Sequence, residues 1–176
     1  MFRTFDSIRD LRDLFEEGVV VTFKHQFGAS GKVRGKEKGK PWNIWIESVH
    51  KTNPEQGISV FQEQVVTLLH ELIHVHSNHC IVPDFNIVKS SCDARDESAM
   101  DEFCYGVLRN NFDLAEEIIF EIISRPNCCI LYESKVPETR DFYLQLLKIV
   151  IPRLGPLHFG NEFQVRILER LRNLSP

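Results

Sequence analysis

One long helical pattern restricts how this chain can fold. Residues 60–77 read VFQEQVVTLLHELIHVHS. With about 100° of rotation per residue and His70 set at zero, the sector between roughly 160° and 300° holds six apolar side chains, namely Phe61, Val65, Leu68, Leu69, Leu72 and Ile73. His70, Glu71 and His74 fall on the other side, between about 0° and 100°. The pattern therefore predicts a helix that buries one apolar stripe and presents these three polar residues on its opposite face.

Two histidines four residues apart on a helix are typical of metal ligands. Both imidazoles of His70 and His74 can reach one ion, and a tetrahedral site needs such converging donors. Glu71 can reach a metal-bound water without being a ligand itself. His76 and His79 fall on the apolar side of this wheel, at about 240° and 180°, so we expect neither to share an ion with the pair. The alternative is a helical protein without metal, in which the histidines are incidental.

A catalytic zinc site needs a third protein ligand and an open position for water. The metzincin arrangement would place a histidine six residues after His74, where this chain has Cys80. The gluzincin arrangement takes a glutamate from a downstream helix, with an aspartate or asparagine four residues later. Glu97 and Asp101 in DESAMDEFC have this spacing and share a helix face. We predict that Glu97 binds the metal and that Asp101 accepts a hydrogen bond from the back nitrogen of a liganding histidine.

A second interpretation of the same acidic segment stays open. Acidic residues in the first turn of a helix complement the helix dipole whether or not a metal is bound. If Glu97 has only that role, the third ligand must come from elsewhere, and the candidates are Asp96, Asp101 and His79.

The remaining sequence predicts an α+β domain. A short amphipathic helix ends at Gly18, and VVVTFKH and WNIWIESV are typical of strands. Ser59 and Gln62 have capping-box spacing at the start of the HELIH helix. We expect a small antiparallel sheet packed against helices, zincin-like around that helix, with further helices at 96–108, 113–124, 139–153 and 160–173. Residues 1–176 are interpreted as a single domain, with a core at about 19–108 and a helical C-terminal part at about 112–174.

Composition and charge narrow the class of protein. The chain has 176 residues, 43% of them hydrophobic, as in an ordinary globular domain. Its net charge of −4 gives no general attraction to nucleic acid or acidic membranes. No apolar run reaches about 18 residues, and charged residues interrupt the N-terminal segment, unlike a secretory signal. We therefore expect a cytoplasmic protein without membrane or nucleic-acid partners.

The cysteines agree with that compartment. They are odd in number and form no CxxC pair, which argues against a disulfide framework and a four-cysteine zinc site. We expect most of them to be small buried apolar residues. They are Cys80, Cys92, Cys104, Cys128 and Cys129.

The segment 32–40, KVRGKEKGK, alternates basic residues with others. Its glycines and lysines are typical of an exposed hairpin loop, or of a strand pair with a long turn. We interpret it as a solvated hairpin whose lysines discourage edge pairing. Contact with phosphate or an acidic partner is the alternative, which the negative net charge disfavours.

The strand, the HELIH helix and the acidic helix together resemble the ImmA/IrrE-type metallopeptidases, a gluzincin-like family, over about residues 40–108. In that family a strand precedes the HExxH helix, and the third ligand lies in a helix reading roughly E-x-x-A-N-x-F-A. PWNIWIES corresponds to the strand, and ESAMDEFC to the later helix. Glu97 stands at the ligand position and Asp101 replaces the asparagine. The resemblance implies cleavage of a narrow protein substrate inside the cell, such as a transcriptional repressor.

The sequence thus predicts a zinc-dependent metallopeptidase. One Zn²⁺ per chain is expected on His70, His74 and Glu97, with Glu71 taking a proton from the metal-bound water and passing it to the leaving amine. The partner is a protein or peptide substrate, and the sequence leaves the oligomeric state open. The alternative is a non-catalytic metal-binding or protein-interaction domain on the same scaffold, in which Glu71 is dispensable.

Stabilisation of the oxyanion needs a further donor. Tyr105 lies on the Glu97 face of its helix, two turns further on, and is one candidate catalytic residue. His50 and His158 are others, and nothing in the sequence selects among them.

Overall fold

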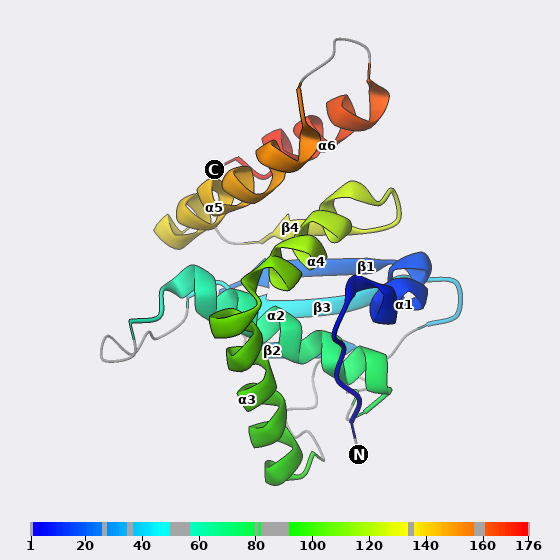
Figure 1. The fold of residues 1–176 in the computed structure, drawn as a ribbon, viewed down its shortest axis with the longest axis vertical. Helices are drawn as coiled ribbons and strands as arrows, with labels where there is room; N and C mark the ends of the chain where they lie inside the picture. The colour runs from blue at the N-terminus through cyan, green and yellow to red at the C-terminus, as the bar shows by residue number, and fades with distance from the viewer. Residues whose placement is uncertain are drawn as a thin grey trace.

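The computed structural model describes residues 2–25, 28–34, 37–49, 57–79, 81, 92–133, 136–156 and 161–175. Figure 1 shows how the elements are arranged around a small sheet. In chain order they are the 3₁₀ helix η1 (Ile8–Leu11), α1 (Arg12–Glu17), β1 (Val19–Lys24), β2 (Gly31–Arg34), β3 (Trp42–Glu47), α2 (Val60–Ser77), α3 (Ala94–Asn110), α4 (Phe112–Ser124), β4 (Cys129–Tyr132), α5 (Pro137–Leu154) and α6 (Glu162–Asn173).

The sheet is mixed, so the expected α+β class is confirmed and the expected antiparallel sheet is wrong. Its strand order is β2-β3-β1-β4. β2 and β3 pair antiparallel, whereas β1 pairs parallel with both β3 and β4. The burial of β1 fits this arrangement. Its residues VVVTFK are buried at four of six positions, and buried and partly exposed positions do not alternate. Strands with both faces covered, as in parallel sheets, have such continuous apolar runs.

The C-terminal part, expected to be helical, also contributes a strand. The four residues of β4 pair with β1 from Val20↔Cys129 to Phe23↔Tyr132. This places a segment from the second half of the chain at the edge of a sheet built by the first half. A run of four residues between helices gives almost no periodic signal, which is why the sequence did not predict it.

The basic segment forms the expected hairpin. Lys32 and Arg34 lie in β2, which is an edge strand, and β2 pairs antiparallel with β3. Lys38 and Lys40 are exposed in the connection, where Lys40 pairs with Glu37. Lys36 lies outside the described residues.

α2 has the predicted bounds and lies against β2 and β3. Ser59 caps its start: the Gln62 N–H donates to Ser59 Oγ at 3.2 Å, and the Ser59 N–H donates to Gln62 Oε1 at 2.8 Å. The helix ends at Asn78, which has a left-handed backbone with φ of 49°. α3 packs across the polar face of α2. Glu71, which lies against β2, and His74 are buried as well as the apolar stripe.

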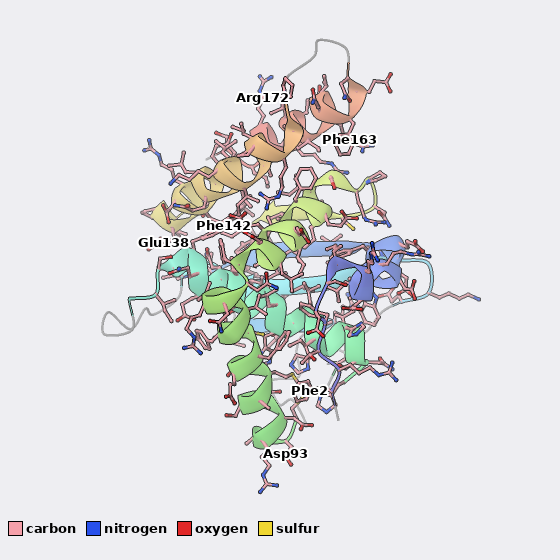
Figure 2. All side chains as sticks on the ribbon, in the orientation of Figure 1. Phe2, Asp93, Glu138, Phe142, Phe163 and Arg172 are labelled. Atoms are coloured by element: carbon pink, nitrogen blue, oxygen red, sulfur yellow. The ribbon has the colours of Figure 1, made fainter. Side chains whose placement is uncertain are left out.

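Phe142 of α5 joins the C-terminal helices to the sheet and to α2 (Figure 2). Its ring centroid lies 4.4 Å from that of Phe23 in β1, 5.3 Å from Phe61 in α2 and 5.6 Å from Tyr132 in β4. α4 in turn contacts α3, α5 and α6. In Figure 1 the α5–α6 pair lies at the opposite end of the molecule from the start of α3. Of the described helices, none combines the length and apolar character needed to cross a membrane.

Candidate metal centre

Facing turns of α2 and α3 bring three predicted ligands together. His70 Nε2 lies 3.0 Å from His74 Nε2 and 3.1 Å from Glu97 Oε2. The other carboxylate oxygen of Glu97 lies 3.6 Å from His74 Nε2. Asp93 caps the start of α3, where its carboxylate accepts from the Arg95 N–H at 2.8 Å, and Glu97 falls in the first turn of the helix. The potential ligand atoms of the three residues all lie within 4.8 Å of one another.

The back nitrogens of both histidines are bound to oxygen. His70 Nδ1 lies 2.8 Å from Asp101 Oδ1, which is the hydrogen bond that the sequence predicted for Asp101. His74 Nδ1 lies 2.9 Å from the His79 carbonyl oxygen. A carbonyl or an ionised carboxylate only accepts, so each Nδ1 is the donor. Each neutral imidazole then has a lone pair on Nε2, directed at its neighbour.

Three electron-pair donors therefore converge on one point. Two Nε2 lone pairs and a carboxylate repel each other unless a cation stands between them. Two imidazoles and one carboxylate are also the donor set of a catalytic zinc site, which leaves one position open. The residues present fit a divalent metal ion, and among metals Zn²⁺ suits this donor set.

The pKa values of the two histidines move in opposite directions. Burial acts to lower the pKa of His70, but the hydrogen bond to Asp101 and the negative charges of Glu71, Asp101 and Glu97 raise it overall. The pKa of His74 is lowered, first by burial and then by the charge of His70. Of the two imidazoles, His70 therefore has the greater tendency to bind a proton when no metal ion is present.

Glu71 is buried beside this group, with 7% of its surface exposed. Burial raises its pKa to about 8, although the charge of His70 acts in the opposite direction. Gly31 of β2 lies directly against it: a Cβ on Gly31 would stand 2.5 Å from Glu71 Oε1 and 2.6 Å from Thr67 Cγ2. Only a residue without a side chain lets β2 approach α2 this closely.

The site opens into a cavity of about 310 Å³. The predicted residues His70, Glu71, Glu97, Asp101 and Tyr105 all line it. Side chains and backbone that the sequence did not single out complete the wall, namely Ser30, Gly31, Glu63, Val66 and Thr67. No sequence signal marked Gly31, because its importance comes from the contact between β2 and α2.

Tyr105 lines the cavity, but its hydroxyl is engaged. It donates to Glu63 Oε2 at 2.9 Å. Burial and this hydrogen bond raise the pKa of Tyr105 to about 12, so the phenol keeps its proton. Tyr105 can therefore reach an oxyanion only by leaving Glu63. The other candidates, His50 and His158, lie outside the described residues.

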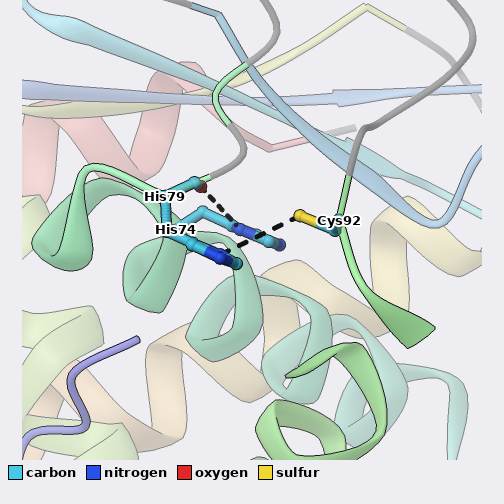
Figure 3. Close-up of side chains that lie close together, drawn as sticks. All are labelled: His74, His79 and Cys92. Atoms are coloured by element: carbon cyan, nitrogen blue, oxygen red, sulfur yellow. Dashed lines mark hydrogen bonds between the residues drawn. The ribbon is translucent and has the colours of Figure 1, made fainter. Parts of the chain in front are cut away.

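His79 lies beside the centre, although the helical wheel placed it on the apolar side. It lies beyond the end of α2, and the left-handed Asn78 turns the chain back so that the His79 N–H bonds to the His74 carbonyl at 2.9 Å. Figure 3 shows the rings of His74 and His79 stacked, with Cys92 beside them. His76, in contrast, packs its ring edge against Phe5, at a centroid distance of 6.4 Å.

Cys92 differs from the other described cysteines. It is disulfide-bonded, whereas Cys104, Cys128 and Cys129 are free. Cys104 and Cys128 are buried, as expected of small apolar residues, but the expected absence of disulfides does not extend to Cys92. Cys80 lies outside the described residues.

Comparison with known proteins adds no relative. No family model matches the chain, and neither a curated protein nor a solved structure matches it. The resemblance to ImmA/IrrE-type metallopeptidases accordingly stays a prediction from the residue pattern.

Proposed function

We propose that this chain is a zinc-dependent metallopeptidase of the gluzincin-like kind, with one Zn²⁺ held by His70, His74 and Glu97. The observation that carries the proposal is the convergence of two Nε2 lone pairs and the Glu97 carboxylate, with both Nδ1 atoms bound to oxygen acceptors. Histidines that bind catalytic metals are oriented in this way by a carboxylate or a carbonyl on the back nitrogen.

Glu71 is the proposed general base. A bound zinc ion would supply Lewis acidity and lower the pKa of a coordinated water. Glu71 lines the cavity next to His70 without belonging to the three converging donors. Its raised pKa suits a group that takes a proton and returns it to the leaving amine. Nearby positive charge favours the ionised carboxylate, so a metal ion would lower that pKa toward the working range.

The edge strand β2 gives the proposed substrate a place to bind. It borders the cavity through Gly31, and it has a described sheet partner on one side only, namely β3. An extended peptide can add to such an edge through main-chain hydrogen bonds. The close packing of Gly31 on Glu71 would then hold that peptide next to the general base. This supports an unfolded or flexible protein segment as the substrate class.

The test uses tag-free protein loaded with zinc, incubated with a mixed peptide library and followed by mass spectrometry. We expect cleavage by the wild type, no cleavage by Glu71→Gln, and zinc retention by that variant. Glu97→Ala should lose both zinc and cleavage. Equal zinc content in Glu97→Ala and wild type would refute the ligand set. Zinc binding without cleavage, together with unchanged behaviour of Glu71→Gln, would establish the non-catalytic binding domain instead.

A further inference from the structure

Beside the proposed zinc site lies a second group of metal-ligand type. His74, His79 and Cys92 have potential ligand atoms within 4.8 Å of one another. Cys92 Sγ lies 3.9 Å from His79 Nδ1. The rings of His74 and His79 are nearly parallel, 3° apart, with centroids separated by 6.1 Å. Figure 3 shows the sulfur and the two rings facing the same small space.

His79 is oriented as a metal-binding histidine would be. Its Nε2 lies 3.3 Å from Asp96 Oδ2, so that its Nδ1 faces Cys92. His70 has the mirror arrangement, with Nδ1 on Asp101 and Nε2 toward the proposed zinc ligands. A carboxylate on one ring nitrogen fixes the tautomer and makes the other nitrogen the better ligand. Asp96 and Asp101 flank Glu97 on α3, and they hold one histidine each.

The disulfide at Cys92 keeps this second group incomplete. A disulfide sulfur is a poor metal ligand, whereas a thiolate is one of the best for Zn²⁺ and Co²⁺. A dithiol reductant opens the bond by exchange. The S–S bond breaks, Cys92 and its partner sulfur take up two electrons and two protons as thiols, and the reductant becomes a disulfide. A metal ion then displaces the proton of the Cys92 thiol to solvent.

We propose that reduction of the Cys92 disulfide creates a second divalent-metal site formed by the Cys92 thiolate, His79 and His74. Because His74 belongs to both groups, this site and the His70–His74–Glu97 site compete for one imidazole. The redox state of Cys92 would therefore decide which ligand set holds the ion. Metal binding by the Cys92 thiolate does not depend on whether the protein is a peptidase.

The experiment is a Co²⁺ titration of the full chain in two states. One sample keeps the disulfide, and the other is reduced with a dithiol and then desalted in the absence of oxygen. Cobalt bound to thiolate gives an intense near-ultraviolet charge-transfer absorption, which nitrogen and oxygen ligands do not give. We expect this band in the reduced wild type, and at least a tenfold weaker absorption in the oxidised protein at equal bound cobalt. Reduced Cys92→Ser and His79→Asn should lose the band, whereas reduced Cys129→Ser should keep it.

The variants make each outcome decisive. Reduced Cys92→Ser retains every other thiol of the chain, so its loss of the band assigns the absorption to Cys92. A reduced wild type that binds cobalt without the band, or a band that persists in Cys92→Ser, overturns this second site and leaves the zinc site of His70, His74 and Glu97 standing. Failure of oxidised protein to bind cobalt, with a normal band after reduction, would instead overturn the proposed function alone. Absence of cobalt binding in both states overturns both.

Discussion

The Nε2 atoms of His70 and His74 lie 3.0 Å apart, and each histidine has its Nδ1 bound to an oxygen acceptor. Two acceptors at this distance are stable only with a cation between them. A proton or a divalent ion can have this role. Binding of a metal ion here would be coupled to folding, because a preformed site of this kind rarely exists in an unfolded chain.

Zinc should stabilise the fold through that coupling. At a free zinc concentration of about 100 times the Kd, the free energy of unfolding should rise by about 2.7 kcal/mol. Glu97→Ala should show little of this increase, since it removes one of the three proposed ligands. Thermal unfolding with and without zinc measures the effect. Glu102→Ala, a neighbouring exposed carboxylate on the same helix, is the matched control and should respond like the wild type.

Asp101 should control zinc affinity without touching the ion. Its carboxylate bonds to His70 Nδ1 at 2.8 Å, and loss of such a partner weakens metal binding by about 10–100-fold. We expect this loss for Asp101→Ala and a much smaller one for Asp101→Asn, whose amide oxygen can still accept. Zinc affinity measured against a competing chelator decides the question. Equal affinities for the alanine variant and the wild type would show that the hydrogen bond has no such role.

Residue spacing along two helices predicted those parts of the candidate metal centre that lie on α2 and α3. His70 and His74 are four residues apart on α2, Glu97 and Asp101 are four apart on α3, and the structure brings the two pairs together. Geometry that depends on a change of chain direction was not predictable. His79 reaches His74 because Asn78 takes a left-handed backbone, which the helical wheel does not describe.

The order and direction of the strands in the sheet were likewise not predictable from the sequence. The strands β1 and β3 were recognised from their composition, but their parallel pairing was not. In that arrangement β2 lies outside β3 at the sheet edge, and both strands contact α2. Ile44 and Ile46 of β3 are fully buried, which fits an inner strand. Period-two patterning gives the faces of a strand but not its neighbours.

The contribution of Glu71 to the stability of the metal-free protein should fall as pH rises. Burial raises the pKa of Glu71 from its ordinary 4.5 to about 8 in the folded state. The folded protein therefore keeps a proton that the unfolded chain releases, and the contribution of Glu71 is fully present below pH 4.5 and lost as pH rises to about 8. The slope is at most about 1.4 kcal/mol per pH unit. Urea unfolding of chelator-treated protein between about pH 5 and about pH 8 measures it.

Glu71→Gln provides the control for that titration. The amide fills nearly the same space and cannot ionise, so its stability should change less with pH than that of the wild type. The difference between the two curves isolates Glu71 from the histidines, which also titrate. Parallel curves would mean that Glu71 is ionised in the folded protein throughout this range, contrary to its burial.

Gly31→Ala, a substitution in β2, should disturb the packing around Glu71. The added Cβ would stand 2.5 Å from Glu71 Oε1 and 2.8 Å from Glu71 Cγ, so β2 or Glu71 has to move. Overpacking of this kind costs about 1–3 kcal/mol in unfolding free energy. If Glu71 is the general base, as proposed, its displacement should lower the peptide cleavage rate by about tenfold or more. Zinc content should stay unchanged, because Glu71 lies outside the proposed ligand set.

Gly106→Ala is the matched control for this substitution. Gly106 lies inside α3, and among the described residues no neighbouring atom would stand within 4 Å of a Cβ added there. Alanine at this position should stabilise the helix by about 0.5–1 kcal/mol and leave cleavage unchanged. Urea unfolding and cleavage rates of the two variants, measured side by side, separate a packing effect at Glu71 from a general effect of replacing glycine. If Gly31→Ala retained both the stability and the cleavage rate of the wild type, β2 would not pack on Glu71 as the structure has it.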